Sequence, residues 1–407
     1  MRLITSTLLV SLVSSAAFAN PILPSEDSYD VLQEALIEVE AGGVIELGAG
    51  TFHLEDGLSL DASGVTLRGQ GMNRTILSFK NQQSGGEGLL VTGANITLED
   101  FAVEDTKGDA IKVKDVDGIT FRRMRAEWTN GPDEKNGAYG LYPVGSRNVL
   151  IEESVAIGAS DAGIYVGQSE DIIVRNSRAE LNVAGIEIEN SYRADVYGNV
   201  ATRNTGGILV FDLPGLPKMG GHDVRVFDNE VVGNLTDNFA PEGNIVAQVP
   251  RGTGIMIMAN KNVEVFNNHI DQHDTVSIAI VTYPLDFDDD RYNPHPRAVH
   301  IHDNKIGTGG TNPDGDIGRE FADLTGSPIP DIVWDGLMPI MDRILGAPSE
   351  NRIVAHGNVK LDGTPAVFMD ADAIAARTLP FFRKEGRTTT SYGDPLPPVN
   401  PVVQNAE

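Results

Sequence analysis

The chain has 407 residues, of which 44 are glycine and none is cysteine, and 31 basic against 58 acidic residues give a net charge of −27. This acidic balance excludes nucleic acid and anionic membrane surfaces as expected partners. The absence of cysteine excludes disulfides and thiolate metal sites. Only 22% of the residues are charged, which together with the many glycines indicates a turn-rich β architecture.

The first residues have the pattern of an export signal. Arg2 is followed by an apolar stretch over residues 3–13 and by the small-x-small sequence Ala17-Phe18-Ala19. This pattern predicts a signal peptide over residues 1–19 and a periplasmic or secreted protein. The apolar stretch is too short to cross a bilayer, and no later run reaches 18 apolar residues, so we expect no membrane span.

A helix is predicted over residues 26–41, directly after the signal segment. Its apolar side chains fall on one helical face: Val31, Leu32, Ala35, Leu36 and Val39. Residues 42–54 and 64–71 then read as short strands and turns. Because the end of a strand stack exposes apolar edges, we expect this helix to cover the first coil.

Small-small-apolar triplets recur along the middle of the chain. Their apolar third residues are Ile111, Leu141, Ile164, Ile186, Ile208, Ile255 and Ile278. Most successive triplets are 22 or 23 residues apart, which is the length of one solenoid coil. The spacing of 30 predicts a coil with an insertion, and the spacing of 47, from Ile208 to Ile255, predicts two coils.

Each repeat also contains a second alternating strand that leads to an asparagine. These asparagines are Asn176, Asn199, Asn229, Asn268 and Asn304. Stacked asparagines tolerate left-handed backbone and pass side-chain hydrogen bonds along a solenoid axis. The pattern predicts an all-β fold, a right-handed single-stranded parallel β-helix over residues 20–310 with an N-terminal cap.

After Asn304 the repeat fades. We expect a loop over 307–318, a helix-containing cover over 319–345, a last coil over 352–363 and a proline-rich extended tail from Pro395. Residues 311–407 are therefore predicted to form a C-terminal cap rather than a second domain.

Over residues 25–310 the chain resembles pectin-lyase-like β-helix proteins, and its middle repeats resemble the carbohydrate-binding and sugar-hydrolase class of β-helices. That class includes mannuronan C5-epimerases, polysaccharide lyases and a periplasmic accessory protein for copper maturation of nitrous oxide reductase. The resemblance implies the fold and, for function, an interaction with carbohydrate. The sequence lacks the Asp-Pro-His motif of the epimerases and a pectate-lyase calcium triad.

Strand alternation predicts which side chains leave the core beside the repeated isoleucines. One outward column contains the candidate catalytic residues Lys112, Tyr142, Tyr165 and Glu187. Candidate substrate-binding residues lie nearby: Lys114, Gln168, Glu189, Asn190, Phe211 and Asp212. Insertions at 130–137, 212–221, 236–251 and 284–297 are expected to wall this face into an open trough, with a polar floor at one end and an apolar floor at the other.

Several chemistries suit such a trough. A uronate lyase or C5-epimerase acting on acidic polysaccharide needs a cation for the substrate carboxylate and proton-transfer groups, roles that Lys112, Tyr142 and Tyr165 could take. Glycoside hydrolysis instead needs two carboxyl groups, for which Glu187 and Glu189 are candidates. The plain alternative is that all of these are ordinary outward strand residues.

Two metal sites and a non-enzymatic function complete the hypotheses. Asp286, Asp288 and Asp290 in one acidic loop offer oxygen ligands for Ca²⁺. His300 and His302 share a strand face and could bind copper or zinc. Whether the chain is an enzyme stays open. The alternative is a monomeric periplasmic accessory or scaffold protein that binds a protein partner or metal, with the apolar floor (Leu209, Phe211, Met256 and Met258) as the docking surface.

Overall fold

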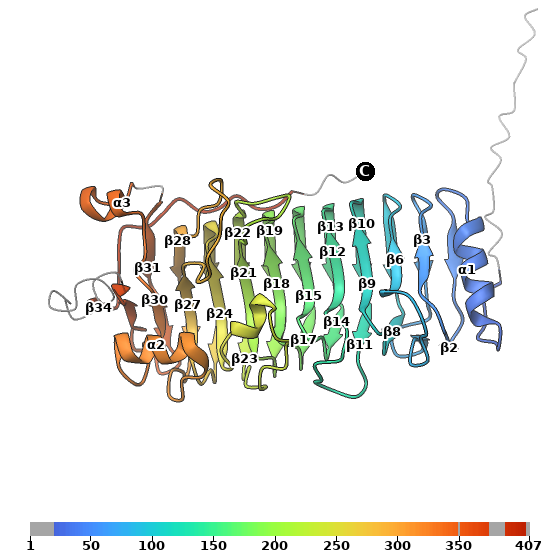
Figure 1. Cartoon of the computed structure of the whole chain (residues 1–407), viewed down its shortest axis with the longest axis horizontal. Coiled ribbons are helices and arrows are strands. Elements are labelled where there is room, and N and C mark those ends of the chain that lie inside the picture. The colour runs from blue at the N-terminus through green and yellow to red at the C-terminus, as the bar shows by residue number, and fades with distance from the viewer. Residues whose placement is uncertain (1–19, 349–350, 374–386, 404–407) are drawn as a thin grey trace, which may run out of the picture.

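The computed structural model describes residues 20–348, 351–373 and 387–403, so the predicted signal peptide lies outside the described residues. Within these ranges the chain winds into a long solenoid whose coils stack along one axis (Figure 1). Each coil contributes one strand to each of three sheets, and successive strands within a sheet pair in parallel. The predicted β-helix is confirmed.

The first sheet contains β1 (Val44–Glu46), β4 (Thr66–Arg68), β7 (Ile96–Glu99), β10 (Asp117–Arg122), β13 (Arg147–Glu152), β16 (Glu170–Arg175), β19 (Tyr192–Tyr197), β22 (His222–Phe227), β25 (Lys261–Phe266), β28 (Arg297–His302) and β31 (Ile353–His356). The second contains β2 (Gly50–His53), β5 (Thr75–Ser78), β8 (Ala102–Glu104), β11 (Arg125–Glu127), β14 (Val155–Ile157), β17 (Arg178–Glu180), β20 (Val200–Thr202), β23 (Glu230–Val232), β26 (His269–Asp271), β29 (Lys305–Ile306) and β32 (Val359–Lys360).

The third sheet carries the repeated triplets. It contains β3 (Leu58–Leu60), β6 (Glu87–Val91), β9 (Asp109–Lys114), β12 (Tyr139–Val144), β15 (Ala162–Gly167), β18 (Ala184–Glu189), β21 (Gly206–Phe211), β24 (Thr253–Met258), β27 (Val276–Val281), β30 (Ile332–Trp334), β33 (Phe368–Asp370) and the antiparallel β34 (Arg387–Thr389). The solenoid thus continues beyond residue 310, through β31, β32 and β33.

The core lies between the three sheets. Ile164, Ile186 and Ile208 are register partners on successive strands and are fully buried, as the repeat predicts. Burial of each such side chain contributes about 1.5–3 kcal/mol. Because one coil repeats the side-chain order of the previous coil, every inward column stacks apolar groups on apolar groups along the axis.

Two ladders of buried amides run along the corners of the solenoid. The predicted ladder passes from Asn199 through Asn229, Asn268 and Asn304 to Asn358, with side-chain hydrogen bonds of 2.8–3.0 Å. The prediction was wrong for Asn176, which has a left-handed backbone (φ 50°) one residue before the ladder position. Ser177 occupies that position, and its backbone N–H donates to Asn199 Oδ1.

The second ladder was not predicted. Asn182 donates to Asn204 and Asn204 to Asn234, and Asn234 Nδ2 lies 3.1 Å from His273 Nε2. These amides also bond to backbone carbonyls of the preceding coils, as Asn204 does to Ala179. The ladders therefore satisfy corner backbone groups that would otherwise be buried without partners.

The 47 residues between Ile208 and Ile255 form one coil, not the predicted two. Ile208 on β21 pairs directly with Ile255 on β24. The additional length lies in two insertions, residues 212–221 after β21 and residues 233–252 before β24, the second of which contains the 3-10 helix η1 (Ile245–Gln248). Chain length alone cannot distinguish a further coil from insertions, because both leave the next strand in register.

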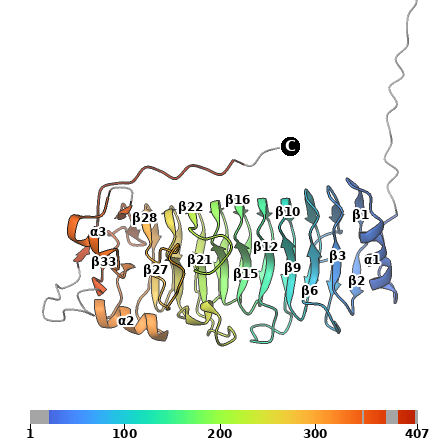
Figure 2. The ribbon, with the colours of Figure 1, turned by 45° about the horizontal axis from the view of Figure 1, so that its top comes forward.

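Helices cover the solenoid at its end and on one face (Figures 1 and 2). The predicted N-terminal helix is α1 (Ser28–Glu38), and it buries Leu32 and Leu36, whereas Val31 is exposed. Two further helices, α2 (Gly315–Thr325) and α3 (Ile340–Leu345), lie near the C-terminal coils. No helix in the described ranges is long and apolar enough to cross a membrane.

The C-terminal segment runs back along the solenoid after β34 (Figure 2). Its backbone is anchored to the outer face of the first sheet, because Val399 N–H donates to Glu264 (2.9 Å) and Val402 N–H donates to Asp195 (3.1 Å). Val399 is itself buried. The predicted extended tail is therefore docked onto the sheet.

Candidate functional site

The outer face of the third sheet holds the predicted catalytic column. Lys112 is the register partner of Tyr142, and Tyr165 is the register partner of Glu187. The insertions do not leave an open trough along the whole face, however. They pack onto its C-terminal part as a second hydrophobic cluster, in which Leu209, Phe211, Met256 and Met258 are at most 3% exposed.

The predicted open apolar floor is covered in the structure. Val246 and Val249 of the insertion before β24, Tyr292 of the loop after β27 and Phe321 of α2 lie on the predicted apolar floor. An open apolar floor would expose large side chains to water, so the chain folds its own insertions over it. The floor is not a surface for docking another protein.

Three tyrosines meet at the edge of this cover. The ring centroids of Tyr139 lie 4.4 Å from those of both Tyr142 and Tyr165, and Tyr142 and Tyr165 lie 5.1 Å apart. Tyr165 is buried, whereas Tyr139 and Tyr142 are half-buried and face the accessible end. Gly167 makes this packing possible, because a Cβ at that position would come within 2.4 Å of the Tyr165 hydroxyl.

Three buried carboxyl groups lie next to the tyrosines. The Tyr165 hydroxyl donates to Glu189 Oε1 (2.7 Å), and the Tyr139 hydroxyl lies 3.5 Å from Asp161 Oδ2. Asn244, from the insertion before β24, also donates to Asp161 (3.3 Å). Glu187 is fully buried, and neither of its carboxyl oxygens has a hydrogen-bond partner. We call Tyr139, Tyr142, Tyr165, Asp161, Glu187 and Glu189 the tyrosine–carboxyl cluster.

Burial disfavours the charged form of these carboxyl groups. Desolvation raises the pKa of Asp161, Glu187 and Glu189, and repulsion from Glu189 adds to the shifts of Asp161 and Glu187. At the accessible margin, desolvation raises the pKa of Asp109 to about 6, although Lys112 opposes the shift. Burial also raises the pKa of Tyr142 to about 12. The site therefore holds carboxyl groups able to donate protons near neutral pH.

Lys112 forms ion pairs with two carboxylates of the site. Its Nζ lies 3.1 Å from Glu87 and 3.6 Å from Asp109, and it approaches the Tyr142 ring to 5.1 Å from the centroid. Since two carboxylates already neutralise this ammonium, it is a weaker partner for a substrate carboxylate than the sequence analysis assumed. Lys114, two residues further along β9, is exposed.

The other predicted substrate-binding residues have varied environments. Asn190 is fully buried and bonds to Leu213 and Lys218, and Asp212 accepts from Gly220 and Gly221, so both residues hold the insertion after β21 in place. Phe211 is buried under the cover. Glu189 belongs to the cluster. Gln168 is half-buried at the corner after β15, with a left-handed backbone (φ 52°).

The acidic loop after β27 gives no preformed calcium cage. Asp286, Asp288 and Asp290 are exposed, while Asp289 pairs with Arg291 at 2.6 Å. Across the described ranges, the one group of at least three His or acidic residues with ligand atoms within 4.8 Å of one another lies on the first sheet and does not include them.

Sequence reasoning missed Tyr139, Asp161 and Asp109. Strict alternation places Tyr139 on the same side as the core residue Leu141, but the ring of Tyr139 contacts the two outward tyrosines. Tyr139 is the first residue of β12, directly after the insertion, so the alternation of the strand does not fix its side. Asp161 lies in the turn before β15, and only the Ser-Asp-Ala sequence ahead of the triplet hints at its position.

A cavity lies elsewhere on the molecule. It measures about 810 Å³ and lies near the C-terminal coils, where Arg297, Arg343 and Arg352 line it together with Trp334 and Tyr392. Arg343 is neutralised by Asp372 at 2.6 Å. This cavity has no residue in common with the tyrosine–carboxyl cluster.

Comparison with solved structures identifies the same architecture in proteins of low sequence identity. The A-module of the mannuronan C-5 epimerase AlgE4 from Azotobacter vinelandii matches with TM-score 0.50, 16% identity, and 83% of this chain and 91% of that chain covered. A family 28 exopolygalacturonase from Yersinia enterocolitica matches with TM-score 0.49 and 12% identity over 84% and 72% of the two chains. DFA-IIIase from Arthrobacter chlorophenolicus A6 matches with TM-score 0.48 and 13% identity over 91% and 88%.

The curated proteins contain no significant match to this sequence. The model of the right-handed β-helix region, in contrast, matches residues 63–217 and 133–285, more than half of the chain. These residues are the coils whose triplets, amide ladders and parallel register are described above. The chain therefore belongs to the right-handed β-helix family.

Proposed function

We propose that this protein is carbohydrate-active and that it works at the accessible end of the tyrosine–carboxyl cluster. The observation that carries the proposal is the pair of half-buried tyrosine rings, Tyr139 and Tyr142, beside Asp109, whose carboxyl group accepts from the backbone N–H of Tyr139 and whose pKa is raised by burial to about 6. Aromatic rings offer apolar faces to sugars, and a protonated carboxyl group can donate to a glycosidic oxygen.

Asp109 is the proposed general acid. Its side chain is 14% exposed, it stands beside Glu87 on the neighbouring strand, and its pKa of about 6 suits proton donation in mildly acidic to neutral solution. Asp161 and Glu189 lie behind the tyrosines and are almost inaccessible. They support the hydroxyl groups of Tyr139 and Tyr165 rather than contact a glycan.

The finer expectation, lyase or C5-epimerase chemistry on acidic polysaccharide, receives less support from the geometry than hydrolysis does. A uronate carboxylate would approach Glu87 and Asp109, and Lys112 is already paired with both. The raised pKa of Tyr142 also makes its hydroxyl a weak proton donor. A neutral glycan avoids this repulsion. The A-module of mannuronan C-5 epimerase shares the fold, but the proposal depends on this chain's own residues.

The test is a panel of neutral and uronate-containing glycans. Release of reducing ends reports hydrolysis, ultraviolet absorbance of an unsaturated product reports elimination, and nuclear magnetic resonance reports epimerisation. We expect hydrolysis of a neutral glycan, with kcat/KM falling above about pH 6 as Asp109 loses its proton. Asp109→Asn should lower kcat by about 10²–10⁴-fold.

The exposed Asp316→Asn variant on α2 is the matched control and should keep full activity. Tyr142→Ala should raise KM, because the ring face is lost while the proposed acid remains. Absence of both product and binding across the panel would contradict carbohydrate activity. Elimination or epimerisation that survives Asp109→Asn would instead assign the finer lyase or epimerase chemistry.

A further inference from the structure

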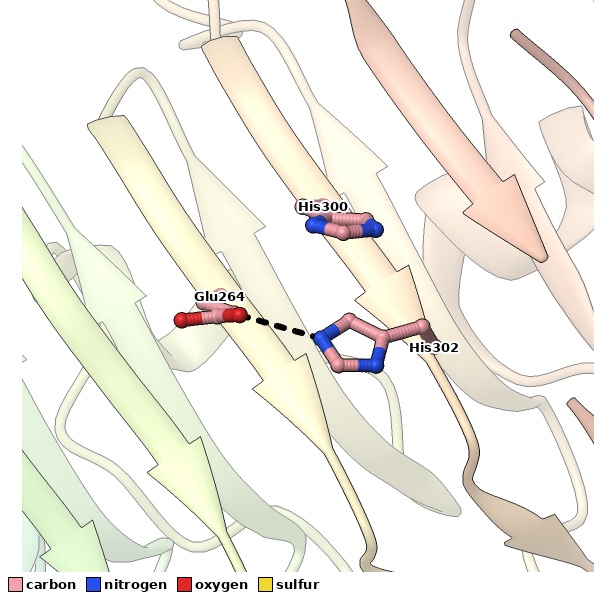
Figure 3. A group of neighbouring side chains, drawn as sticks. All are labelled: Glu264, His300 and His302. Atoms are coloured by element: carbon pink, nitrogen blue, oxygen red, sulfur yellow. Dashed lines mark hydrogen bonds and ion pairs between the residues drawn. The ribbon is translucent and has the colours of Figure 1, made fainter. Parts of the chain in front are cut away.

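A group of histidines lies on a different face, far from the tyrosine–carboxyl cluster. His300 and His302 on β28 point outward from the first sheet toward Glu264 on the neighbouring β25 (Figure 3). His356 on β31 follows as the register partner of His302. We call Glu264, His300, His302 and His356 the histidine cluster. It uses none of the residues proposed for carbohydrate chemistry.

The ligand atoms of Glu264, His300 and His302 converge, whereas His356 is hydrogen-bonded to His300 and is not part of that group. Glu264, His300 and His302 each offer a ligand atom, and these atoms all lie within 4.8 Å of one another, which occurs nowhere else in the described ranges for three such residues. His302 Nε2 lies 3.0 Å from Glu264 Oε1, and His300 Nε2 lies 2.5 Å from His356 Nε2. Donor atoms around one tetrahedral Zn²⁺ lie about 3.3 Å apart, a separation between the 3.0 Å of the His302–Glu264 pair and the 4.8 Å limit of the group.

The surroundings favour a ligand rather than water. His300 is 6% exposed, and its Nδ1 has no hydrogen-bond partner. His302 Nδ1 contacts Asp303 Oδ2 at 2.8 Å, an arrangement that orients the ring and leaves Nε2 directed at the cluster. A carboxylate behind a histidine in this way is the usual outer partner of a metal-binding imidazole.

We propose that Glu264, His300 and His302 bind one divalent first-row transition-metal ion, with His356 adjacent to His300. Two imidazoles and one carboxylate match the ligand preference of Zn²⁺, Co²⁺ and Ni²⁺, and not that of Ca²⁺, which prefers oxygen ligands only. The C-terminal tail covers the site, since Val399 N–H donates to Glu264 Oε2 while Oε1 faces His302. An ion held there therefore shares Glu264 with the tail.

The experiment titrates EDTA-treated full-length protein with Zn²⁺ by calorimetry and with Co²⁺ by visible absorbance. We expect one ion per chain, intense d–d bands from low-coordinate Co²⁺, and no displacement by a large excess of Ca²⁺. His302→Gln and His300→Gln should each weaken Zn²⁺ binding by at least about 10–100-fold. The matched control is His269→Gln, an exposed histidine on the second sheet, which should bind as the unaltered protein does.

Failure of the unaltered protein to bind Zn²⁺ or Co²⁺ overturns the proposal, and so does unchanged affinity in both histidine variants. Displacement of the ion by Ca²⁺ overturns the assignment to transition metals. If the histidine variants do not fold, the Glu264→Gln variant tests the metal site instead. Its side chain retains an acceptor for Val399 N–H and removes the carboxylate charge. Undiminished Zn²⁺ affinity in folded Glu264→Gln would contradict a shared metal site.

Discussion

The carboxyl group of Glu187 lies in a position that lowers the stability of the folded protein. Its register neighbour Leu209 is apolar, and its other register neighbour Tyr165 is hydrogen-bonded to Glu189. The carboxyl group of Glu187 is fully buried and has no hydrogen-bond partner. An unsatisfied buried polar group costs about 1–3 kcal/mol. A destabilising residue beside a candidate site, such as Glu187, is typical of a position that is constrained by function.

The Glu187→Met variant should be more stable than the unaltered protein by about 1–3 kcal/mol at pH 8. Burial raises the pKa of Glu187 well above its unfolded value, so the folded chain keeps a proton that the unfolded chain loses. The contribution of Glu187 to stability therefore falls as pH rises above about 4, and the gain from Glu187→Met should shrink toward that pH.

Denaturant unfolding at pH 4.5 and pH 8 measures this difference. The exposed Glu134→Met serves as control and should change stability by less than about 0.5 kcal/mol at either pH. A Glu187→Met variant less stable than the unaltered protein at pH 8 would show that the carboxyl group has a stabilising partner.

The elements of the solenoid are joined along its axis by the amide ladders as well as by strand pairing. Asn229 lies in the middle of the first ladder: it donates to Val196 O and to Asn268 Oδ1, and it accepts from Asn199. Each ladder residue thus satisfies groups on the coils before and after its own. Removing one side chain leaves several buried polar groups without partners.

Asn229→Ala should destabilise the protein by about 2–4 kcal/mol, because at least two buried groups lose their hydrogen bonds. Thermal unfolding followed by circular dichroism measures the change. The exposed Asn73→Ala, in a turn before β5, is the control and should shift the midpoint little. Equal midpoints for the two variants would mean that the ladder carries no net stabilising energy.

The sequence predicted those features that repeat. The stack of Ile164, Ile186 and Ile208 follows from a 22-residue period, and most of the first ladder follows from recurrent asparagines. Features made by single insertions were not predictable, because their direction depends on tertiary packing. The spacing before Ile255 was therefore read as two coils, and the apolar floor was read as exposed, although Val246 covers it.

The candidate site was predicted in part for the same reason. Tyr142 and Tyr165 lie on the regular strand, where alternation gives their side. Tyr139 is the first residue of β12 and Asp161 lies in the turn before β15, and at these positions alternation does not give the side. The salt bridge between Lys112 and Glu87 joins residues of neighbouring coils, whose side-chain directions cannot be derived from a single repeat.

At the scale of the whole molecule, export of the protein with removal of residues 1–19 is a proposal that the sequence pattern of those residues supports.

Expression with its native N-terminus in a bacterium tests export. We expect the protein in the periplasmic or extracellular fraction, with mass spectrometry assigning Asn20 as the first residue. A variant with Asp in place of Leu8 and Leu9 should remain in the cytoplasm with Met1 or Arg2 at its start, since charges interrupt the apolar segment. Intact residues 1–19 in a fractionated periplasmic sample would contradict cleavage after Ala19.

The docked C-terminal tail has a consequence for how the molecule unfolds. In a solenoid each repeat touches only its neighbours, so unfolding can begin at one end and proceed coil by coil. Val399 and Val402 bind β25 and β19, strands separated in the stack by β22. The tail therefore connects the C-terminal end of the solenoid to its middle coils, and we expect it to couple the unfolding of these two regions.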